Sequence, residues 1–385
     1  MPPSAHDKLL FTPGPLTTSL SVKQAMLHDA GSWHFEFNHI VAEIRRRLLA
    51  LAGTSRDQGF ECVLMQGSGS FGVESVLGSV IPPNGRVLIL ANGAYGERIV
   101  RMAEVLKISH LAYRTAEDTP TNPSAVERIL AQDPAVTHVA AVHCETTTGI
   151  LNPIQPIGQV TRQHQRRFIV DAMSSFGALP IELESCGIDY LVSSANKCIE
   201  GVPGFSFALA RRDPFLATAG WARSLSLDLL GQWQGFEKTG QFRYTPPTHA
   251  LLAFHQALDE WEAEGGVTGR GARYQQNHAT LMHGMCSLGF QPFLPAHVQS
   301  PIITAFRHPA DPAFRFDEFY RRLSDRGMII YPGKLTQIDT FRIGTIGRLF
   351  PADLEQLLAA IRLSLNEMGC ALPFNSTPQP HAIPG

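Results

Sequence analysis

Between residues 60 and 212 the chain alternates short apolar runs with helix-length stretches. The runs have the character of strands, and stretches such as 124–132 and 157–165 are long enough to be helices. Near-continuous apolar strands separated by helices indicate a mainly parallel sheet that is covered on both faces. The seven predicted strands cover 62–66, 86–91, 108–113, 138–143, 167–171, 189–194 and 205–210.

The next predicted helix has Thr248 as its N-cap and ends at the glycine pair 265–266. After this helix the regular alternation of strands and helices ends. Beyond it, strands and helices mix as in a smaller α+β domain, with strands over 300–306, 327–332 and 339–344 and helices near 272–288, 316–326 and 352–367. The pattern predicts an α/β protein with a large domain over 1–265, a small C-terminal domain over 266–370 and a flexible tail over 371–385.

Composition narrows the class of protein. The 385 residues are 44% hydrophobic and 17% charged. A formal net charge of −2 gives no excess of positive charge for binding nucleic acid or an anionic membrane. No run of eighteen apolar residues and no signal peptide are visible. The six cysteines are scattered without metal spacing, and the fifteen histidines form no HExxH pattern. We expect a soluble, cytoplasmic protein with reduced thiols and no metal site.

A glycine-rich segment, "GSGSFG" at 67–72, follows a predicted strand and opens a helix. The free backbone amides of a helix N-terminus bind phosphate groups well. A dinucleotide fold also needs an acidic residue at the end of the next strand, where this chain has Ala91 and Asn92. The segment therefore predicts a phosphate site without identifying a nucleotide, and with 33 glycines in the chain a chance match is a real alternative.

Two further residues change this picture. Asp171 ends the apolar strand 167–171, and Lys197 follows the apolar run 189–194. Ligands of open α/β sheets bind at the carboxyl ends of the strands, although such a carboxylate can also serve as a helix cap. Together with the phosphate site, these residues fit pyridoxal 5′-phosphate. A lysine forms its Schiff base, a carboxylate pairs with its ring nitrogen and a helix N-terminus holds its phosphate.

The chain resembles the fold-type-I, pyridoxal-phosphate-dependent aminotransferases of class V over most of its length. "DAMSSFG" (171–177), "SSANKCI" (193–199) and "PGK" with "FRIG" resemble the branch of the family that transfers the amino group of 2-aminoethylphosphonate to pyruvate. Further similar segments are "LLFTPGPLTTS" (9–19), "LMQGSGSFGVESVLGS" (64–79), "HCETTTGILNPI" (143–154) and "RYTPPTHALLAF" (243–254). The resemblance implies this activity, with phosphonoacetaldehyde and alanine as products.

The resemblance also implies roles for the matching residues. Lys197 would bind the cofactor and relay a proton, and Asp171 would keep the ring nitrogen protonated. Thr245 would reach the phosphate of the other subunit, so the resemblance implies a homodimer with shared active sites. The remaining cofactor-binding residues would be Ser68, Gly69 and Ser70 with Asn196 at the phosphate, Tyr95 stacked on the ring and Thr146 at its phenolic oxygen.

Arg342, in a strand of the small domain, would bind the substrate through its planar guanidinium, which suits a carboxylate or a phosphonate. Two of these assignments have ordinary structural alternatives. Tyr95 can be a core tyrosine, and Arg342 can belong to a salt bridge at a strand edge.

One segment departs from the phosphonate branch, which usually carries acidic residues after the tryptophan. Here "GSWHFEFNH" (31–39) has His34 and Phe35 at those positions and keeps Glu36. The exact amino donor therefore stays open, and an alanine–glyoxylate or serine–pyruvate aminotransferase is the main alternative. A cysteine desulfurase would need a mobile-loop cysteine, for which only Cys286 and Cys370 are available. A nucleotide-binding module without enzymatic activity is the alternative from another class.

Overall fold

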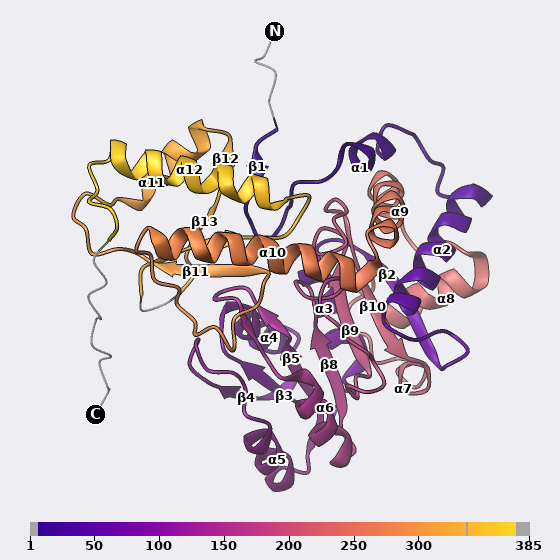
Figure 1. The fold of residues 1–385 in the computed structure, drawn as a ribbon. Coiled ribbons are helices and arrows are strands. Elements are labelled where there is room, and N and C mark those ends of the chain that lie inside the picture. The colour runs from indigo at the N-terminus through magenta and orange to yellow at the C-terminus, as the bar shows by residue number, and fades with distance from the viewer. Residues whose placement is uncertain (1–6, 336–337, 375–385) are drawn as a thin grey trace.

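The computed structural model of the protein describes residues 7–335 and 338–374 (Figure 1). The larger part is built on a seven-stranded sheet, and a smaller part lies beside it. The long helix α10 (Gly266–Ser287) begins next to α9 and packs along α12 of the smaller part. The predicted domain boundaries stay predictions, and residues 375–385 of the predicted tail lie outside the described residues.

The central sheet has the strand order β2-β10-β9-β8-β5-β3-β4. Only β10 runs antiparallel to its neighbours, so the predicted mainly parallel sheet of seven strands is confirmed. All seven predicted strands are present, as β2 (Phe60–Gln66), β3 (Arg86–Ala91), β4 (Ser109–Arg114), β5 (Val136–Val142), β8 (Arg167–Asp171), β9 (Tyr190–Ser194) and β10 (Phe205–Arg211).

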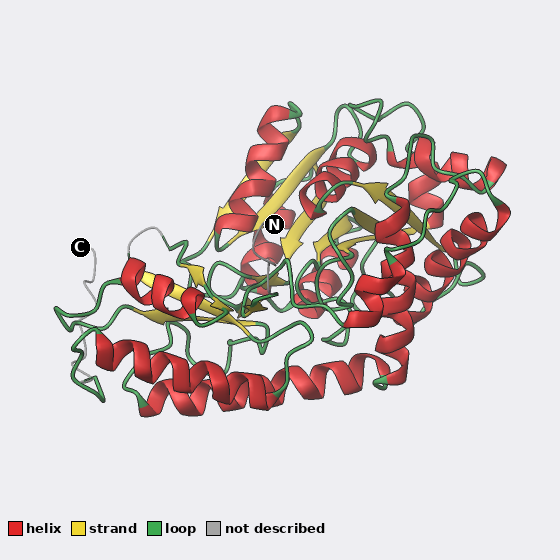
Figure 2. Cartoon of the chain, turned by 90° about the horizontal axis from the view of Figure 1, so that it is seen from above, coloured by secondary structure: helices red, strands yellow, loops and turns green. Residues whose placement is uncertain are grey.

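The central strands are buried on both faces, which explains why they read as continuous apolar runs. Helices flank the sheet in the view from above (Figure 2). The helices of this part are α1 (Leu20–Ala25), α2 (Phe35–Leu51), α3 (Gly69–Val80), α4 (Ala94–Val105), α5 (Pro123–Gln132), α6 (Ile154–Gln163), α7 (Arg212–Leu216), α8 (Leu229–Thr239) and α9 (Thr248–Ala263).

Local chemistry sets several helix ends. The Asn122 side chain accepts a hydrogen bond from the Ser124 amide at 2.9 Å and caps α5. Gly240 ends α8 in the left-handed conformation, with φ of 73°. The predicted N-cap of α9 is wrong by one residue. Pro247 occupies that position without a side-chain cap, because Thr248 already has a helical backbone.

The smaller part packs around phenylalanines. Phe290 and Phe306 lie with their ring centroids 5.4 Å and 5.8 Å from that of Phe341. The N-terminal strand β1 pairs in parallel with β12 of this part. The remaining elements are β1 (Leu9–Leu10), β6 (Cys144–Glu145), β7 (Ile150–Leu151), β11 (Ile303–Arg307), α11 (Phe316–Asp325), β12 (Met328–Ile329), β13 (Tyr331–Pro332), β14 (Thr340–Gly344) and α12 (Pro351–Glu367).

A buried ionic cluster joins α10 to the loop that follows β9. The Glu200 carboxylate accepts hydrogen bonds from Arg273 Nη2 at 2.7 Å and Tyr274 Oη at 2.6 Å. Arg270 Nη1 donates to the backbone oxygen of Cys198 at 2.5 Å, so both arginines hold the chain just after Lys197. Arg270 and Glu200 are almost completely buried, and each therefore depends on the other members of the cluster for its charge.

Removing the Glu200 carboxylate leaves Tyr274 Oη without its acceptor, and two buried guanidinium groups then share a single carboxylate, that of Glu264. We expect Glu200→Ala to lower the free energy of unfolding by about 3–5 kcal/mol, measured by chemical denaturation of the cofactor-loaded protein. The control is Glu104→Ala, because Glu104 pairs with the exposed Arg101 on the surface and its loss should cost at most about 1 kcal/mol. Equal losses in the two variants would contradict the assigned role of the cluster.

Candidate active site

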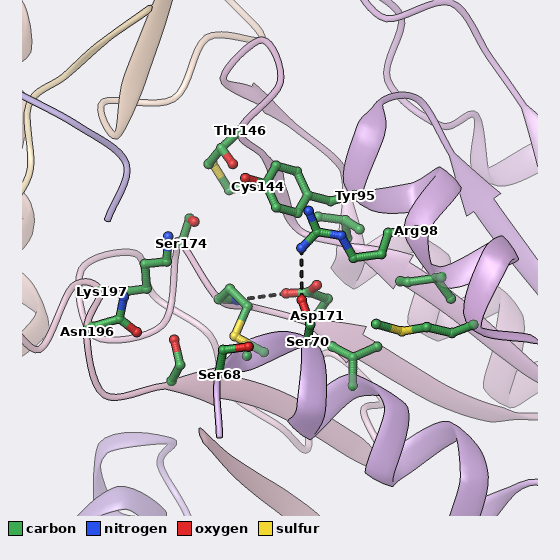
Figure 3. Close-up of a pocket in the computed structure, with 17 residues that line it drawn as sticks. Ser68, Ser70, Tyr95, Arg98, Cys144, Thr146, Asp171, Ser174, Asn196 and Lys197 are labelled. Carbon is green, nitrogen blue, oxygen red and sulfur yellow. Dashed lines mark hydrogen bonds between the residues drawn. The ribbon is translucent and has the colours of Figure 1, made fainter. Parts of the chain in front are cut away.

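A cavity of about 210 Å³ opens at the carboxyl ends of the central strands (Figure 3). This is the edge at which open α/β sheets bind ligands. Thr245 and Arg342 are the two predicted site residues that do not line it. The other predicted residues all do, namely Ser68, Gly69, Ser70, Tyr95, Thr146, Asp171, Asn196 and Lys197.

The glycine-rich loop delivers the N-terminus of α3 to the cavity. Gly67 has φ of 100°, which favours glycine, and Ser68 is the extended N-cap residue without a side-chain cap. The first amides of a helix have no acceptor within the helix, so they are available to a ligand. Gly72 permits the close packing of α3 on β10, because a Cβ there would lie 2.6 Å from Ser206 Oγ.

Asp171 is the last residue of β8 and its side chain is buried. Its Oδ1 accepts a hydrogen bond from the Met173 amide at 2.9 Å. Burial nevertheless raises the pKa of the Asp171 carboxyl to about 6. The fold thus holds at the cavity wall a carboxylate that a positive charge on a ligand would stabilise.

Lys197 lies in the loop three residues beyond the end of β9. Its Nζ donates a hydrogen bond to the backbone oxygen of Pro13 at 2.5 Å. Gly14 is required beside it, because a Cβ there would lie 2.7 Å from Nζ. Burial lowers the pKa of Lys197, which favours the neutral, nucleophilic amine. This contact was not among the predictions, although the two prolines that flank Gly14 already indicate a fixed backbone.

Tyr95 is placed by a buried carboxylate. Glu145 accepts hydrogen bonds from the amides of Tyr95 and Gly96, each at 3.1 Å, and so stabilises the N-terminus of α4. Burial raises the pKa of Tyr95, but a hydrogen bond with Thr146 and the positive charges of Lys197, Lys334 and Arg342 lower it overall. The Tyr95 ring therefore stands in a positively charged part of the site.

Arg342 belongs to β14 and lies behind the cavity wall. Its Nη1 donates to the backbone oxygen of Thr146 at 2.8 Å and its Nε to that of Pro332 at 3.0 Å. Within the described part of the chain no carboxylate lies within ion-pair distance of Arg342, so the alternative of a strand-edge salt bridge finds no partner. Two of its donors are already used by the backbone.

Arg98 is a cavity residue that the sequence analysis did not identify. Its Nη1 donates to Ser70 Oγ at 2.9 Å, and its guanidinium carbon lies 4.7 Å from the centroid of the Tyr95 ring. Figure 3 shows it pointing from α4 towards Ser70. Its position three residues after Tyr95 was the available signal, because such pairs share one face of a helix.

Two predicted features lie apart from the cavity. Thr245 is exposed, and its backbone oxygen accepts a hydrogen bond from Gln66 Nε2 at 3.3 Å. In the segment 31–39, Trp33 and Phe35 are 78% and 72% exposed, and no residue of this segment lines the cavity in the same chain. These residues therefore form no part of the cavity wall of their own chain.

The described residues offer neither a metal site nor a membrane-spanning helix. In the ranges 7–335 and 338–374 no group of three or more acidic, histidine or cysteine side chains could hold a metal ion. No helix in these ranges is long and apolar enough to cross a membrane. All six cysteines are free, and neither Cys286 nor Cys370 lines the cavity.

Comparison with curated proteins shows near full-length relatives. Proteins named 2-aminoethylphosphonate–pyruvate transaminase from Salmonella paratyphi C (strain RKS4594) and Salmonella typhimurium (strain LT2) are each 51% identical to this chain over 364 residues. The match covers 94% of this chain and 99% of each relative. The chain is therefore similar to these transaminases throughout, from the N-terminal segment to the small C-terminal part.

Solved structures share the fold. Pyridoxamine–pyruvate aminotransferase from Mesorhizobium loti is 24% identical, with a TM-score of 0.86 over 96% of this chain and 95% of that chain. Alanine–glyoxylate aminotransferase from Nostoc sp. is 23% identical, with a TM-score of 0.86 over 95% of this chain and 97% of that chain. The family model described as "Aminotransferase class-V" matches residues 20–329. The chain therefore belongs to the class-V aminotransferase family, whose cofactor is pyridoxal 5′-phosphate.

Proposed function

We propose that the protein transfers the amino group of 2-aminoethylphosphonate to pyruvate, giving phosphonoacetaldehyde and alanine. The observation that carries this proposal is the 51% identity, over 94% of the chain, to transaminases of that name. Family membership already makes the chain an aminotransferase, so the alternative of a nucleotide-binding module without enzymatic activity is wrong.

The cavity residues fit the cofactor. Pyridoxal 5′-phosphate supplies an aldehyde that exchanges amino groups and a ring that takes up electrons from the substrate carbon. Ser68, Gly69 and Ser70 would hold its phosphate at the N-terminus of α3, with Asn196 beside them. The other contacts would come from Tyr95 at the ring face, Thr146 at the phenolic oxygen, Asp171 at the ring nitrogen and Lys197 at the aldehyde.

Two side chains would handle the protons. Lys197 would bind the cofactor and, once the substrate amine replaces it, carry the proton of the substrate carbon on Nζ. The lowered pKa of Lys197 suits this task, because the neutral amine can accept a proton. Asp171 would keep a proton on the ring nitrogen, since a neighbouring cation offsets the cost of its buried charge.

The anionic substrates would bind beside Tyr95. Arg342 offers a planar guanidinium there, and Lys334 Nζ lies 5.1 Å from the centroid of the Tyr95 ring. The backbone oxygens of Thr146 and Pro332 hold the guanidinium in place, and the donors that these two bonds leave unused would bind the anion. Pyruvate and 2-aminoethylphosphonate share a negative charge at one end, which one such subsite can recognise.

We further propose a cytoplasmic homodimer with shared active sites. Large apolar side chains at Leu20, Leu27, Trp33 and Phe35 are all more than two-thirds exposed, which supports an interface with a second copy. The exposed position of Thr245, outside the cavity of its own chain, leaves it available to a partner's phosphate site. Six free cysteines support a reducing compartment.

The amino donor is tested by measuring the alanine formed from pyruvate with one donor at a time, in the presence of pyridoxal 5′-phosphate. We expect 2-aminoethylphosphonate to give at least about tenfold more alanine than serine, because only the phosphonate offers a dianion to Arg342 and Lys334. Alanine with glyoxylate is assayed in parallel as the competing reaction. A preference for serine, or for alanine with glyoxylate, would refute the proposed donor and leave the aminotransferase assignment intact.

Lys197→Ala should abolish transamination and the covalent attachment of the cofactor. Borohydride reduction followed by peptide mass spectrometry should label Lys197 in the unaltered protein and nothing in the variant. Lys334→Ala is the matched control, because Lys334 is the next lysine near Tyr95 and its loss should leave the label in place. A label on any other lysine would disprove the role of Lys197.

The pKa of Asp171 gives a stability test on the cofactor-free protein. The pKa of Asp171 is about 6 in the folded protein, against the ordinary 3.8. At a pH between 3.8 and about 6 the folded protein therefore keeps a proton that the unfolded chain has released. Ionisation of Asp171 therefore removes stability as the pH rises from about 4 to about 6, and the loss then stays constant. The Asp171→Asn variant does not ionise and avoids this loss. In urea denaturation, its free energy of unfolding should rise by about 3 kcal/mol relative to that of the unaltered protein between pH 4 and pH 7. A gain that does not change with pH would contradict the burial argument.

A further inference from the structure

The cavity holds one cation that the proposed cofactor contacts leave unused. Among the described residues that line it, only Lys197 and Arg98 carry a positive charge. Lys197 is committed to the aldehyde end of the cofactor and lies next to Pro13. Arg98 has no assigned partner in the reaction.

Several contacts orient Arg98 towards the phosphate end of the cavity. It extends from α4, donates through Nη1 to Ser70 Oγ at 2.9 Å, and stacks 4.7 Å from the centroid of the Tyr95 ring (Figure 3). The preceding residue, Glu97, forms its ion pair with Arg114 instead. In the part of the chain that the structure describes, no carboxylate lies within 4 Å of the Arg98 guanidinium, and its charge is therefore not neutralised by an ion pair.

The phosphate site needs such a charge. Ser68 and Ser70 are neutral, and the N-terminus of α3 contributes only about half an elementary charge. A phosphate monoester carries close to two negative charges near neutral pH. Guanidinium groups bind phosphate oxygens through charge-assisted hydrogen bonds and are hydrated more weakly than ammonium groups.

We propose that Arg98 is the counter-ion of the cofactor's phosphate, which it reaches beside Ser70. This inference rests on the proposed placement of the phosphate at the N-terminus of α3. The two helices would then have different roles. The N-terminus of α3 supplies amides and hydroxyls to the phosphate, and Arg98 of α4 supplies the full positive charge. Arg98 would thereby retain the cofactor whenever Lys197 is released from it.

A competing role is available from the same geometry. The charge of Arg98 also lowers the pKa of Asp171, and its guanidinium orients the Tyr95 ring. Either effect would act on the pyridine ring and not on the phosphate. The two roles are separated by pyridoxal, which has the same ring and aldehyde but no phosphate.

The experiment titrates the cofactor-free protein with pyridoxal 5′-phosphate and, separately, with pyridoxal, following the visible absorbance of the bound form. We expect Arg98→Ala to weaken binding of pyridoxal 5′-phosphate by about 10- to 100-fold, as the loss of a charge-assisted contact predicts. Binding of pyridoxal should change less than about twofold. Arg98→Lys, which keeps the charge but not the fork, should fall between the two.

Arg101→Ala is the matched control. Arg101 lies on the same helix, is 75% exposed and pairs with Glu104, so its removal should leave both titrations unchanged. Equal weakening of both ligands by Arg98→Ala, or no weakening of either, would overturn the proposal. Failure of the unaltered protein to bind pyridoxal 5′-phosphate would instead refute the proposed function, so the two failures are distinguishable.

Discussion

The parallel arrangement of β8 and β9 is the constraint on which the site depends. Because the two strands pair in parallel, their carboxyl ends meet at one edge of the sheet. Asp171 ends one strand and Lys197 follows the other, so the sheet itself brings an acid and an amine to one cavity. Loops of moderate length could not impose this placement by themselves, since their backbones are free to vary.

The C-terminal part and the N-terminal segment complete the site from outside the sheet. The Pro13 carbonyl contacts Lys197, and the chain around it is held in turn by the small part, where the Gly344 amide donates to the oxygen of Phe11 at 2.9 Å. From the other side, Glu200 and the arginines of α10 fix the loop after Lys197. Contacts with residues from outside the sheet therefore hold the segment around the lysine on two sides.

Strand positions and the Asp171–Lys197 pair were predictable because they depend on local pattern. Each buried strand is a separate apolar run, and the strand ends are visible in the sequence. The partners of Lys197 were not predictable, since Pro13 is 184 residues away and acts through its backbone oxygen. Arg98 was missed for a related reason: its spacing places it on the same face of α4 as Tyr95, but the sequence does not show that Ser70 lies opposite it. The N-cap of α9 was misassigned because threonine is favoured as an N-cap residue, whereas in the structure Pro247 takes the N-cap position and Thr248 begins the helix.

Charge balance links these observations. Asp171 lines the cavity and Glu145 binds the amides at the N-terminus of α4, and burial raises the pKa of both carboxyls. Arg98 and Lys197 line the cavity, while the charges of Lys334 and Arg342 lower the pKa of Tyr95. The site thus combines buried carboxylates with several cations, among which Arg342 is as deeply buried as Asp171. A ligand that fits this arrangement carries a positive charge near Asp171 and negative charges near the cations. A protonated pyridine ring with a phosphate on one arm and an anionic substrate on another has that distribution, which is why binding and catalysis can use the same set of charges.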